Sequence, residues 1–228
     1  SWRFLGPTGV SNGQTYGESR VIVSGRVAAI AVDPSNTSHV LCGGAGGGVW
    51  ETRNTGASWA PRSDTAPTLT VGAIAFDPSA PTTVYCGTGE GNFYWRLGAG
   101  ILRSTDGGTT WSLLVGAPFV GQGFYDLIVD PANGAHLLAA TTRGIYESSD
   151  GGATWSQRRA STTWDLAMRP SGGASAEVLA GCRDGLFRSA DGGTSWTAVT
   201  LPSAPAAWDR LAVSHVRSNP AVAYAFGS

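Results

Sequence analysis

The chain has 228 residues, of which 42% are hydrophobic, only 14% are charged and 33 are glycine. Nine tryptophans, seven phenylalanines and six tyrosines supply enough apolar surface for a folded core, which excludes an intrinsically disordered chain. The net charge of −1 excludes the basic surface of a nucleic-acid-binding protein, and the apolar runs are too short to span a membrane. We expect residues 1–228 to form one domain, with no nucleic acid and no membrane as partner.

A repeat is the strongest pattern in the sequence. Four units, each with several strand-like runs, end at Trp59, Trp111, Trp155 and Trp196, and these tryptophans lie 52, 44 and 41 residues apart. No unit contains a periodic stretch of helical length. Units of about 40–50 residues with four short strands are typical of β-propeller blades. We therefore predict an all-β propeller of antiparallel blades, with about four and a half blades in this chain at residues 24–62, 69–115, 122–159, 162–200 and, in part, 207–228.

The last three tryptophans close the same turn. The pattern Ser104-x-Asp106-x-Gly108-x-Thr110-Trp111 recurs at residues 148–155 and 189–196, and residues 52–59 form a degenerate copy with Asn54 in place of Asp. An Asp side chain can accept hydrogen bonds from nearby backbone amides, Gly allows a positive φ, and we expect each Trp to be buried as an anchor. The pattern resembles the Asp-box (BNR) repeat of sialidases, xyloglucanase-type hydrolases and sortilin-like receptors. This resemblance implies a structural role for six residues: Asp106, Trp111, Asp150, Trp155, Asp191 and Trp196.

The two ends of the chain suggest how the propeller closes. Trp2-Arg-Phe-Leu5 resembles the outer strands that follow Trp111 and Trp196, so we predict that residues 2–5 form the outer strand of the last blade. Propellers of the resembled family usually have six to eight blades. Further C-terminal blades or a second chain are therefore expected to complete the ring, and the resemblance implies a secreted, extracellular protein.

The three cysteines match no metal-binding spacing. Cys42 and Cys86 each lie nine residues after an Asp-Pro pair, and Ala139 occupies the corresponding position in the third unit. A position that accepts either Cys or Ala indicates a small, buried packing site. The sequence predicts neither a metal nor a cofactor.

Blade topology predicts where a ligand could bind. The starts of the inner strands and the loops between second and third strands share one rim, and the Asp-box turns lie on the other. The first rim should gather Arg26, Arg143 and Arg183 with the long insertion at 89–99. Flat aromatic side chains in this insertion suit stacking on sugars or burial at a protein interface, but they could instead plug the channel. The candidate ligand-binding residues of the insertion are Glu90, Phe93, Tyr94, Trp95 and Arg96.

An aromatic–Asp pair recurs at three strand starts: Tyr125-Asp126, Trp164-Asp165 and Trp208-Asp209. Repetition in register favours a structural role in which each Asp caps amides of a neighbouring blade. The functional alternative is a set of carboxylates for general acid–base chemistry, with Asp126, Asp165 and Glu90 as catalytic candidates. The first two blades carry Ala29 and Ala73 at the equivalent positions, so any acidic ring is one-sided.

Two departures from the resembled enzymes argue against catalysis. Sialidases carry an Arg-Ile-Pro motif, but Val27-Ala28 follows Arg26 here. Xyloglucanase-type hydrolases place a catalytic Asp in a Thr-Asp-x-Gly-Gly loop of the first blade, and the corresponding residues 42–48 contain no carboxylate. We predict a module that binds a glycan or a protein partner, with a glycoside hydrolase as the alternative.

Overall fold

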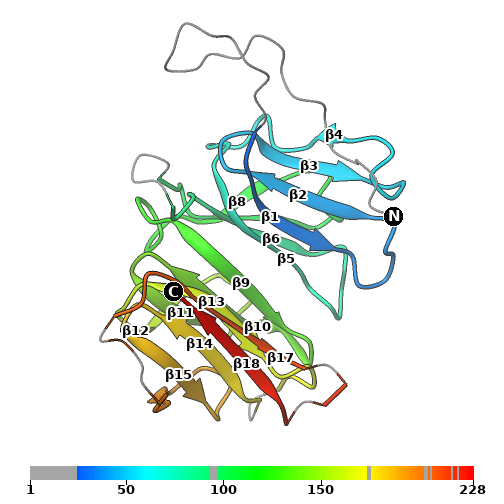
Figure 1. Cartoon of the computed structure of the whole chain (residues 1–228). Helices are drawn as coiled ribbons and strands as arrows, with labels where there is room; N and C mark the ends of the chain where they lie inside the picture. Colours follow the sequence, from blue (N-terminus) through cyan, green and yellow to red (C-terminus); the bar gives the residue numbers. More distant parts are fainter. Residues whose placement is uncertain are drawn as a thin grey trace, which may run out of the picture.

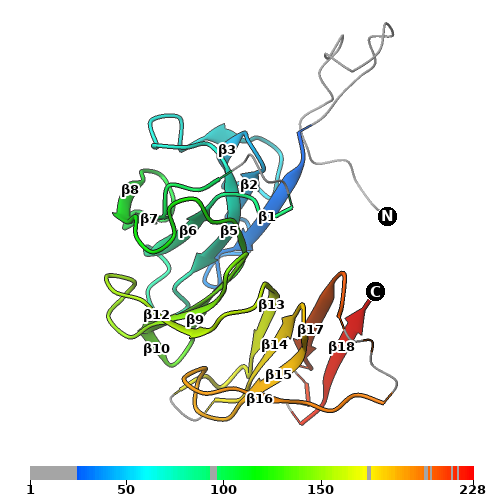
Figure 2. The same ribbon diagram turned by 90° about the vertical axis from the view of Figure 1, so that its left-hand side faces the viewer.

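A computed structural model describes residues 25–92, 97–173, 176–202, 205, 207–216, 218–219 and 221–228. All regular secondary structure in these residues is β-strand, in five antiparallel sheets that follow one another along the chain (Figures 1 and 2). Sheets I to IV have four strands and sheet V has two. The predicted all-β architecture of repeated four-stranded sheets is confirmed. The expected outer strand at residues 2–5 lies outside the described residues.

The strands of each sheet pair in simple chain order. Sheet I contains β1 (Val27–Val32), β2 (Val40–Gly44), β3 (Gly48–Thr52) and β4 (Ala60–Pro61). Sheet II contains β5 (Val71–Phe76), β6 (Val84–Thr88), β7 (Ile101–Ser104) and β8 (Ser112–Val115). Sheet III contains β9 (Phe124–Asp130), β10 (Asn133–Thr141), β11 (Gly144–Ser148) and β12 (Ser156–Arg159). Sheet IV contains β13 (Thr163–Met168), β14 (Val178–Cys182), β15 (Gly185–Ser189) and β16 (Thr197–Ala198), and sheet V contains β17 (Leu211–His215) and β18 (Ala223–Gly227).

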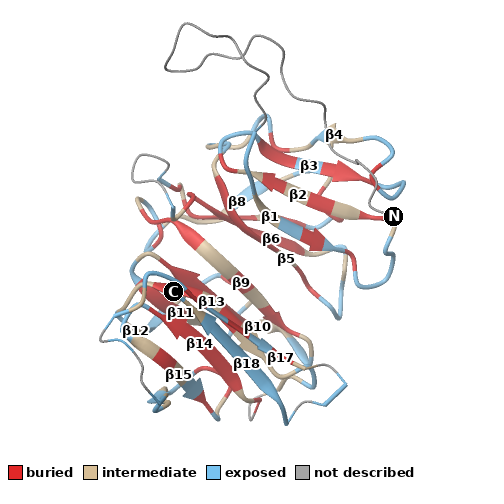
Figure 3. Cartoon of the chain, in the orientation of Figure 1, coloured by how far each residue is buried: buried red, intermediate tan, exposed pale blue. Residues whose placement is uncertain are grey.

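The hydrophobic core lies between consecutive sheets rather than within any one of them. The cluster between sheets I and II, for example, joins Leu41 of β2 to Ile74 of β5 and Leu102 of β7. Similar clusters fill the next three junctions. An inner sheet is therefore apolar on both faces, which explains why β5 and β6 are apolar runs without a polar alternation. Burial mapped on the ribbon follows this arrangement (Figure 3).

The small-residue position predicted from the cysteines is confirmed. Cys42, Cys86 and Ala139 occupy equivalent places in β2, β6 and β10, opposite Ile30, Ile74 and Leu127. Cys86 and Ala139 are fully buried, whereas Cys42 is only partly buried because no sheet precedes sheet I in the described structure. Burial raises the pKa of the Cys86 thiol to about 12, so this thiol is unreactive.

The turns between strands lie on two opposite rims of the stacked sheets, as predicted. The strand-entry rim comprises the residues that precede each first strand and the turns between second and third strands. Backbone hydrogen bonds tie these two groups together within sheets, as from Arg183 N to Thr162 O at 2.9 Å. Other bonds continue to the next sheet, as from Phe124 N to Gly89 O at 2.8 Å and from Trp208 N to Arg183 O at 2.9 Å. Hydrogen bonds therefore link the strand-entry rim from sheet to sheet, and the link from sheet III to sheet IV runs from the Thr162 hydroxyl to Thr142 O.

The aspartate rim is the opposite one and carries the turns at 52–59, 104–111, 148–155 and 189–196, here called aspartate turns. In the third, Asp150 accepts hydrogen bonds from Ser148 Oγ and Thr154 N at 2.8 and 2.9 Å. Ser148 Oγ in turn accepts the Gly152 amide at 2.9 Å. The Trp155 indole N–H donates to the Gly152 carbonyl at 2.8 Å. These bonds recur in the second and fourth turns with the same spacing.

The tryptophans that close these turns correct one expectation. Trp59, Trp111, Trp155 and Trp196 are partly buried rather than buried as predicted, and none of them is mostly exposed. The last three pack against the edges of inter-sheet clusters while their indole nitrogens stay at the turn. The closest approach to the preceding sheet is made by a glycine of the turn. A Cβ added at Gly108, where φ is +92°, would lie 2.6 Å from the Leu41 side chain. The turn itself, rather than the indole ring, closes the junction between sheets.

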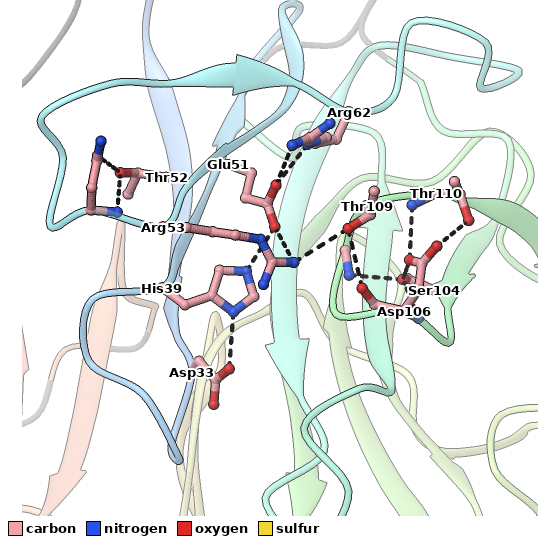
Figure 4. A network of polar contacts seen from close by, with 12 residues as sticks. Asp33, His39, Glu51, Thr52, Arg53, Arg62, Ser104, Asp106, Thr109 and Thr110 are labelled. Carbon is pink, nitrogen blue, oxygen red and sulfur yellow. Dashed lines mark hydrogen bonds and ion pairs between the residues drawn. The ribbon is translucent and has the colours of Figure 1, made fainter.

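A buried ionic network reinforces the junction of sheets I and II (Figure 4). His39 lies between two carboxylates, with Nδ1 2.9 Å from Asp33 Oδ2 and Nε2 3.0 Å from Glu51 Oε1. Arg53 pairs with Glu51 at 2.6 Å and donates to Thr109 Oγ1 of the second aspartate turn at 3.3 Å. The network therefore links β1, β2 and β3 to the next sheet on the aspartate rim.

Sheet III carries a second copy of this arrangement. His136 lies 3.0 Å from Asp130 and 3.3 Å from Glu147. Thr194 of the fourth aspartate turn donates to Glu147 at 3.2 Å. The repetition, together with the burial of both imidazoles, indicates that these polar groups hold consecutive sheets together.

Candidate functional site

The predicted rim residues of sheets I and II are brought together. Arg26, immediately before β1, donates from its guanidinium to Glu90 Oε2 at 2.5 Å. Glu90 is almost fully buried, and its other oxygen accepts the Asn92 amide at 3.1 Å. Both oxygens of this carboxylate are therefore engaged in fixing the start of the insertion at 89–99. Phe93, Tyr94, Trp95 and Arg96, the remaining candidates of the insertion, lie outside the described residues.

Two more sheets hold the same loop. Tyr125 at the start of β9 donates its hydroxyl to Gly91 O at 2.8 Å. Arg210, just before β17, donates to Asn92 Oδ1 at 2.8 Å and places its guanidinium 5.6 Å from the centre of the Tyr125 ring. Residues 89–92 of sheet II thus contact residues of sheets I, III and V on one rim.

Asp126 and Asp165 each accept a backbone amide of the next sheet, the contact that the structural interpretation predicts. Asp126 Oδ1 accepts the Leu127 amide at 2.8 Å, and its Oδ2 accepts the Leu166 amide of sheet IV at 3.1 Å. Asp165 Oδ2 accepts the Val213 amide of sheet V at 2.7 Å. Each carboxylate therefore joins the first strand of its own sheet to the first strand of the next.

Burial changes the protonation of these two carboxyl groups. Removal from water, aided by repulsion from the Asp165 carboxylate, raises the pKa of Asp126 to about 7. Burial also raises the pKa of Asp165 above its usual value, which the nearby Arg210 partly offsets. The pair consequently carries less than two full negative charges at neutral pH.

The structure corrects the position of the third aromatic–Asp pair, Trp208-Asp209, relative to the first strand of its sheet. The Val213 amide bonds to Asp165 as the Leu166 amide bonds to Asp126, so Val213 matches Leu166 and Ala212 matches Asp165. Asp209 lies before β17, where its backbone amide donates to Ser228 O at 2.8 Å. Trp208-Asp209 resembles the other two pairs in sequence. The loops before the first strands differ in length, however, so this resemblance does not fix the position of the pair relative to β17.

Arg143 and Arg183 lie in the strand-entry turns of sheets III and IV, and both side chains are exposed. Their turns are adjacent, because Thr162 donates its hydroxyl to Thr142 O at 3.0 Å while its own carbonyl accepts the Arg183 amide at 2.9 Å. Arg26 lies on the same rim but is committed to Glu90. The three arginines therefore do not converge on one anion as a sialidase would require.

Sequence reasoning missed two features of this rim. The contact between Arg210 and Asn92 joins residues 118 positions apart, and no local pattern announces it. Three exposed apolar side chains, Leu69, Leu97 and Val120, also occupy loops of the rim in sheets I and II. Backbone bonds show that these loops are neighbours, since Gly121 N donates to Gly98 O at 3.1 Å and the Thr70 hydroxyl to Leu97 O at 3.4 Å. Leu69, which Thr68 and Thr70 flank in the sequence, carried the available signal.

Within the described ranges, no group of three or more His, Cys, Asp or Glu side chains could hold a metal ion. The same residues include no helix that is long and apolar enough to cross a membrane.

Comparisons with known proteins give structural matches only, because no family model and no curated protein matches the chain. A GH74 xyloglucanase from Xanthomonas campestris superimposes with a TM-score of 0.67 at 18% identity, over 88% of this chain and 35% of its own. YCF48 bound to D1 peptide gives 0.59 at 18% identity, over 82% and 57%. The extracellular domain of BT4673 from B. thetaiotaomicron gives 0.57 at 15% identity, over 83% and 24%. The shared fold is the β-propeller.

This propeller spans only part of each of those proteins, so the likeness concerns the fold alone. The strand-entry rim of the propeller unites charged, aromatic and apolar side chains from five consecutive sheets on a hydrogen-bonded backbone. Its carboxylates hold backbone amides and a guanidinium rather than facing solvent as a pair.

Proposed function

We propose that this propeller is a binding module whose strand-entry rim contacts a glycan or a protein partner. The observation that carries the proposal is the state of the three catalytic candidates. Asp126 and Glu90 use both oxygens, and Asp165 holds the Val213 amide. A hydrolase of the two-carboxylate type needs one carboxyl group at the leaving oxygen and another beside the sugar ring. A binding rim needs only fixed contacts, which these carboxylates help to position.

Three exposed apolar side chains in neighbouring loops support the choice of rim. Leu69, Leu97 and Val120 are exposed in neighbouring loops of the strand-entry rim. Apolar side chains gathered on a polar surface mark contact sites for partners. Backbone hydrogen bonds between these loops reduce the ordering entropy that binding would otherwise require.

The structural neighbours are consistent with both ligand classes. One is a xyloglucanase and another was solved with a D1 peptide bound. The neighbour BT4673 was solved as an extracellular domain, which agrees with the extracellular location that we propose for this chain. Ring completion by further blades or a second chain is also part of the proposal, since sheet V has two strands in the described structure.

A pair of leucines tests the proposed rim. Leu97→Arg should abolish binding to ligands found with a glycan panel and a random peptide library, because it places a charge in the apolar part of the rim. Leu113→Arg on the outer strand β8 is the matched control, since Leu97 and Leu113 are 54% and 47% exposed. Affinity would be measured by fluorescence anisotropy and folding by a thermal melt.

The same preparation separates binding from hydrolysis. Incubation with xyloglucan should release no reducing ends, whether or not the polysaccharide is bound. Release of reducing ends that Asp126→Asn eliminates would contradict the proposal and support the hydrolase alternative. Equal loss of ligand by Leu97→Arg and Leu113→Arg would place the binding site elsewhere.

A further inference from the structure

The described arginines differ in whether their guanidinium groups have an interaction partner. In the described structure nine of the eleven arginines contact a carboxylate, an amide oxygen or an aromatic ring. Arg143 and Arg183 are the two whose guanidinium groups have no such partner among the described residues. Both lie in adjacent turns of the strand-entry rim, and both are exposed.

The rest of the same stretch adds positive charge. Arg210 is held by the Asn92 amide and the Tyr125 ring, and the carboxyl group on which its charge acts is the partly buried Asp165. Asp184 is already paired with Arg159, and Asp209 is the exposed carboxylate of this stretch without an arginine partner. Over sheets III to V, three exposed guanidinium groups therefore accompany one exposed carboxylate, Asp209, that is not paired with an arginine. Burial raises the pKa of Asp126 to about 7, which further reduces the negative charge of this stretch.

The arginine stretch is continuous with the apolar part of the rim. Phe124 N donates to Gly89 O, which joins the entry of sheet III to the loop that leads to Leu97. Thr142 N donates to Gly123 O at 3.0 Å, and the hydrogen bonds then continue through Thr162 to Arg183. The three exposed apolar side chains thus lie beside the exposed Arg26 and Asp64 in one part of the rim, and the exposed guanidinium groups of Arg143, Arg183 and Arg210 lie over sheets III to V.

We infer that the ligand of this rim is an acidic peptide segment that places apolar side chains against Leu69, Leu97 and Val120 and carboxylates against Arg143 and Arg183. This inference rests on the proposed binding function and names the ligand class. Guanidinium groups recognise carboxylates through paired N–H donors. A peptide can supply apolar and anionic side chains along one extended chain, whereas an acidic glycan matches only the guanidinium groups of the rim.

Peptide selection tests the inference. A random dodecapeptide library displayed on phage is selected on the immobilised chain and, in parallel, on the variant Arg143→Gln/Arg183→Gln. Selection on the native chain should enrich Asp or Glu together with apolar residues, and selection on the variant should lose the acidic bias. A synthetic peptide from the native selection should bind the variant about tenfold more weakly, with an affinity for the native chain that falls as salt rises.

The matched control is Arg53→Gln/Arg188→Gln, which removes the same charge from the other face of the molecule. It should bind the synthetic peptide as the native chain does. Thermal melts of both variants check folding, and the rim variant should melt as the native chain does because its two guanidinium groups form no hydrogen bond, ion pair or ring contact with another described side chain.

Four outcomes separate the inference from the proposed function. Acidic enrichment that depends on Arg143 and Arg183 supports both. Selected peptides without acidic bias, or equally tight binding by the rim variant, overturn the inference; if Leu97→Arg still abolishes binding, the proposed function stands. Arginine-dependent binding of uronate or sialic-acid glycans with no peptide selected overturns the peptide class. No peptide and no glycan bound contradicts the proposed function itself.

Discussion

Sheets I and II carry similar residues at equivalent positions, yet they differ in burial. Ile30 and Ile74 are each paired with a cysteine on the neighbouring strand, but Ile30 is 66% exposed and Ile74 only 8%. Trp50 of β3 is 39% exposed, whereas Leu102 at the equivalent place in β7 is 1% exposed. The difference has one cause: sheet I covers the face of sheet II, and no described sheet covers the corresponding face of sheet I.

This comparison shows where the stability of the chain resides. A four-stranded sheet of this repeat has two apolar faces and buries each only against a neighbour. The same side chain therefore contributes strongly in an inner sheet and weakly in an end sheet. At the other end, Tyr224 and Phe226 of sheet V are exposed for the same reason. Substitutions at matched positions test this dependence on neighbours directly.

The largest effect is expected at the matched isoleucines. Ile74→Ala should lower the free energy of unfolding by about 2–5 kcal/mol, because it leaves a cavity between sheets I and II. Ile30→Ala should lower it by less than about 1 kcal/mol, since its side chain is mostly exposed. Urea titration of both variants measures the difference. Similar losses would mean that another chain or segment covers sheet I in solution.

An intermediate effect is expected at the aspartate turns. Ser148→Ala removes the acceptor of the buried Gly152 amide and should lower the free energy of unfolding by about 1–3 kcal/mol. Thr52 accepts the Gly56 amide at 2.9 Å in the first turn, so Thr52→Val makes the same deletion in sheet I. The loss should be smaller there, because that turn packs against no preceding sheet in the described structure. Equal losses by urea titration would show that the turn acts alone.

The smallest effect is a local response to pH. Hydrogen bonds from the Thr154 hydroxyl, the Thr154 amide and Ser148 lower the pKa of Asp150 to about 2. A lowered pKa stabilises the turn above pH 4, the usual range of the carboxyl group, and this contribution is lost as the pH falls through about 2. The first turn carries Asn54, whose Oδ1 accepts the Ser58 amide and does not titrate.

Amide hydrogen exchange followed by NMR measures this response. The Thr154 amide should lose protection between pH 4 and pH 2, while the Ser58 amide should keep its protection over the same range. If both amides respond alike, acid weakens the sheets as a whole rather than the carboxylate of the turn.

The sequence predicted the architecture because each unit repeats its own local signals. Alignment of equivalent positions in the repeated units was enough to predict three features. These are the Asp, Gly and Trp of the aspartate turns, the small residue opposite Ile74 and the amide-capping role of Asp126. The prediction was wrong where register was ambiguous. Trp208-Asp209 looked like a strand start, but the longer loop before β17 displaced it, and Ala212 occupies the equivalent position. The prediction that the turn tryptophans are buried holds only in part, because the indole nitrogens of the last three bond to the turn at the surface.

Only part of the candidate site could be predicted from the sequence. Loop positions on the rim followed from topology, so Arg26, Glu90, Arg143 and Arg183 were placed on it correctly. That Glu90 is neutralised by Arg26, whereas Arg143 and Arg183 are left without a partner among the described residues, could not be predicted.

By itself, the sequence determined the repeat, the strands, the turns and the rim on which each loop lies, because these depend on contacts within one unit. Only the tertiary structure decided which faces are buried, which carboxylates are occupied and which arginines remain available. Those properties arise between units: the Leu166 amide meets Asp126 across a sheet junction, and Arg210 meets Asn92 across the rim. Interactions between residues so far apart in the chain depend on how the sheets stack, and no local pattern of residues encodes that arrangement.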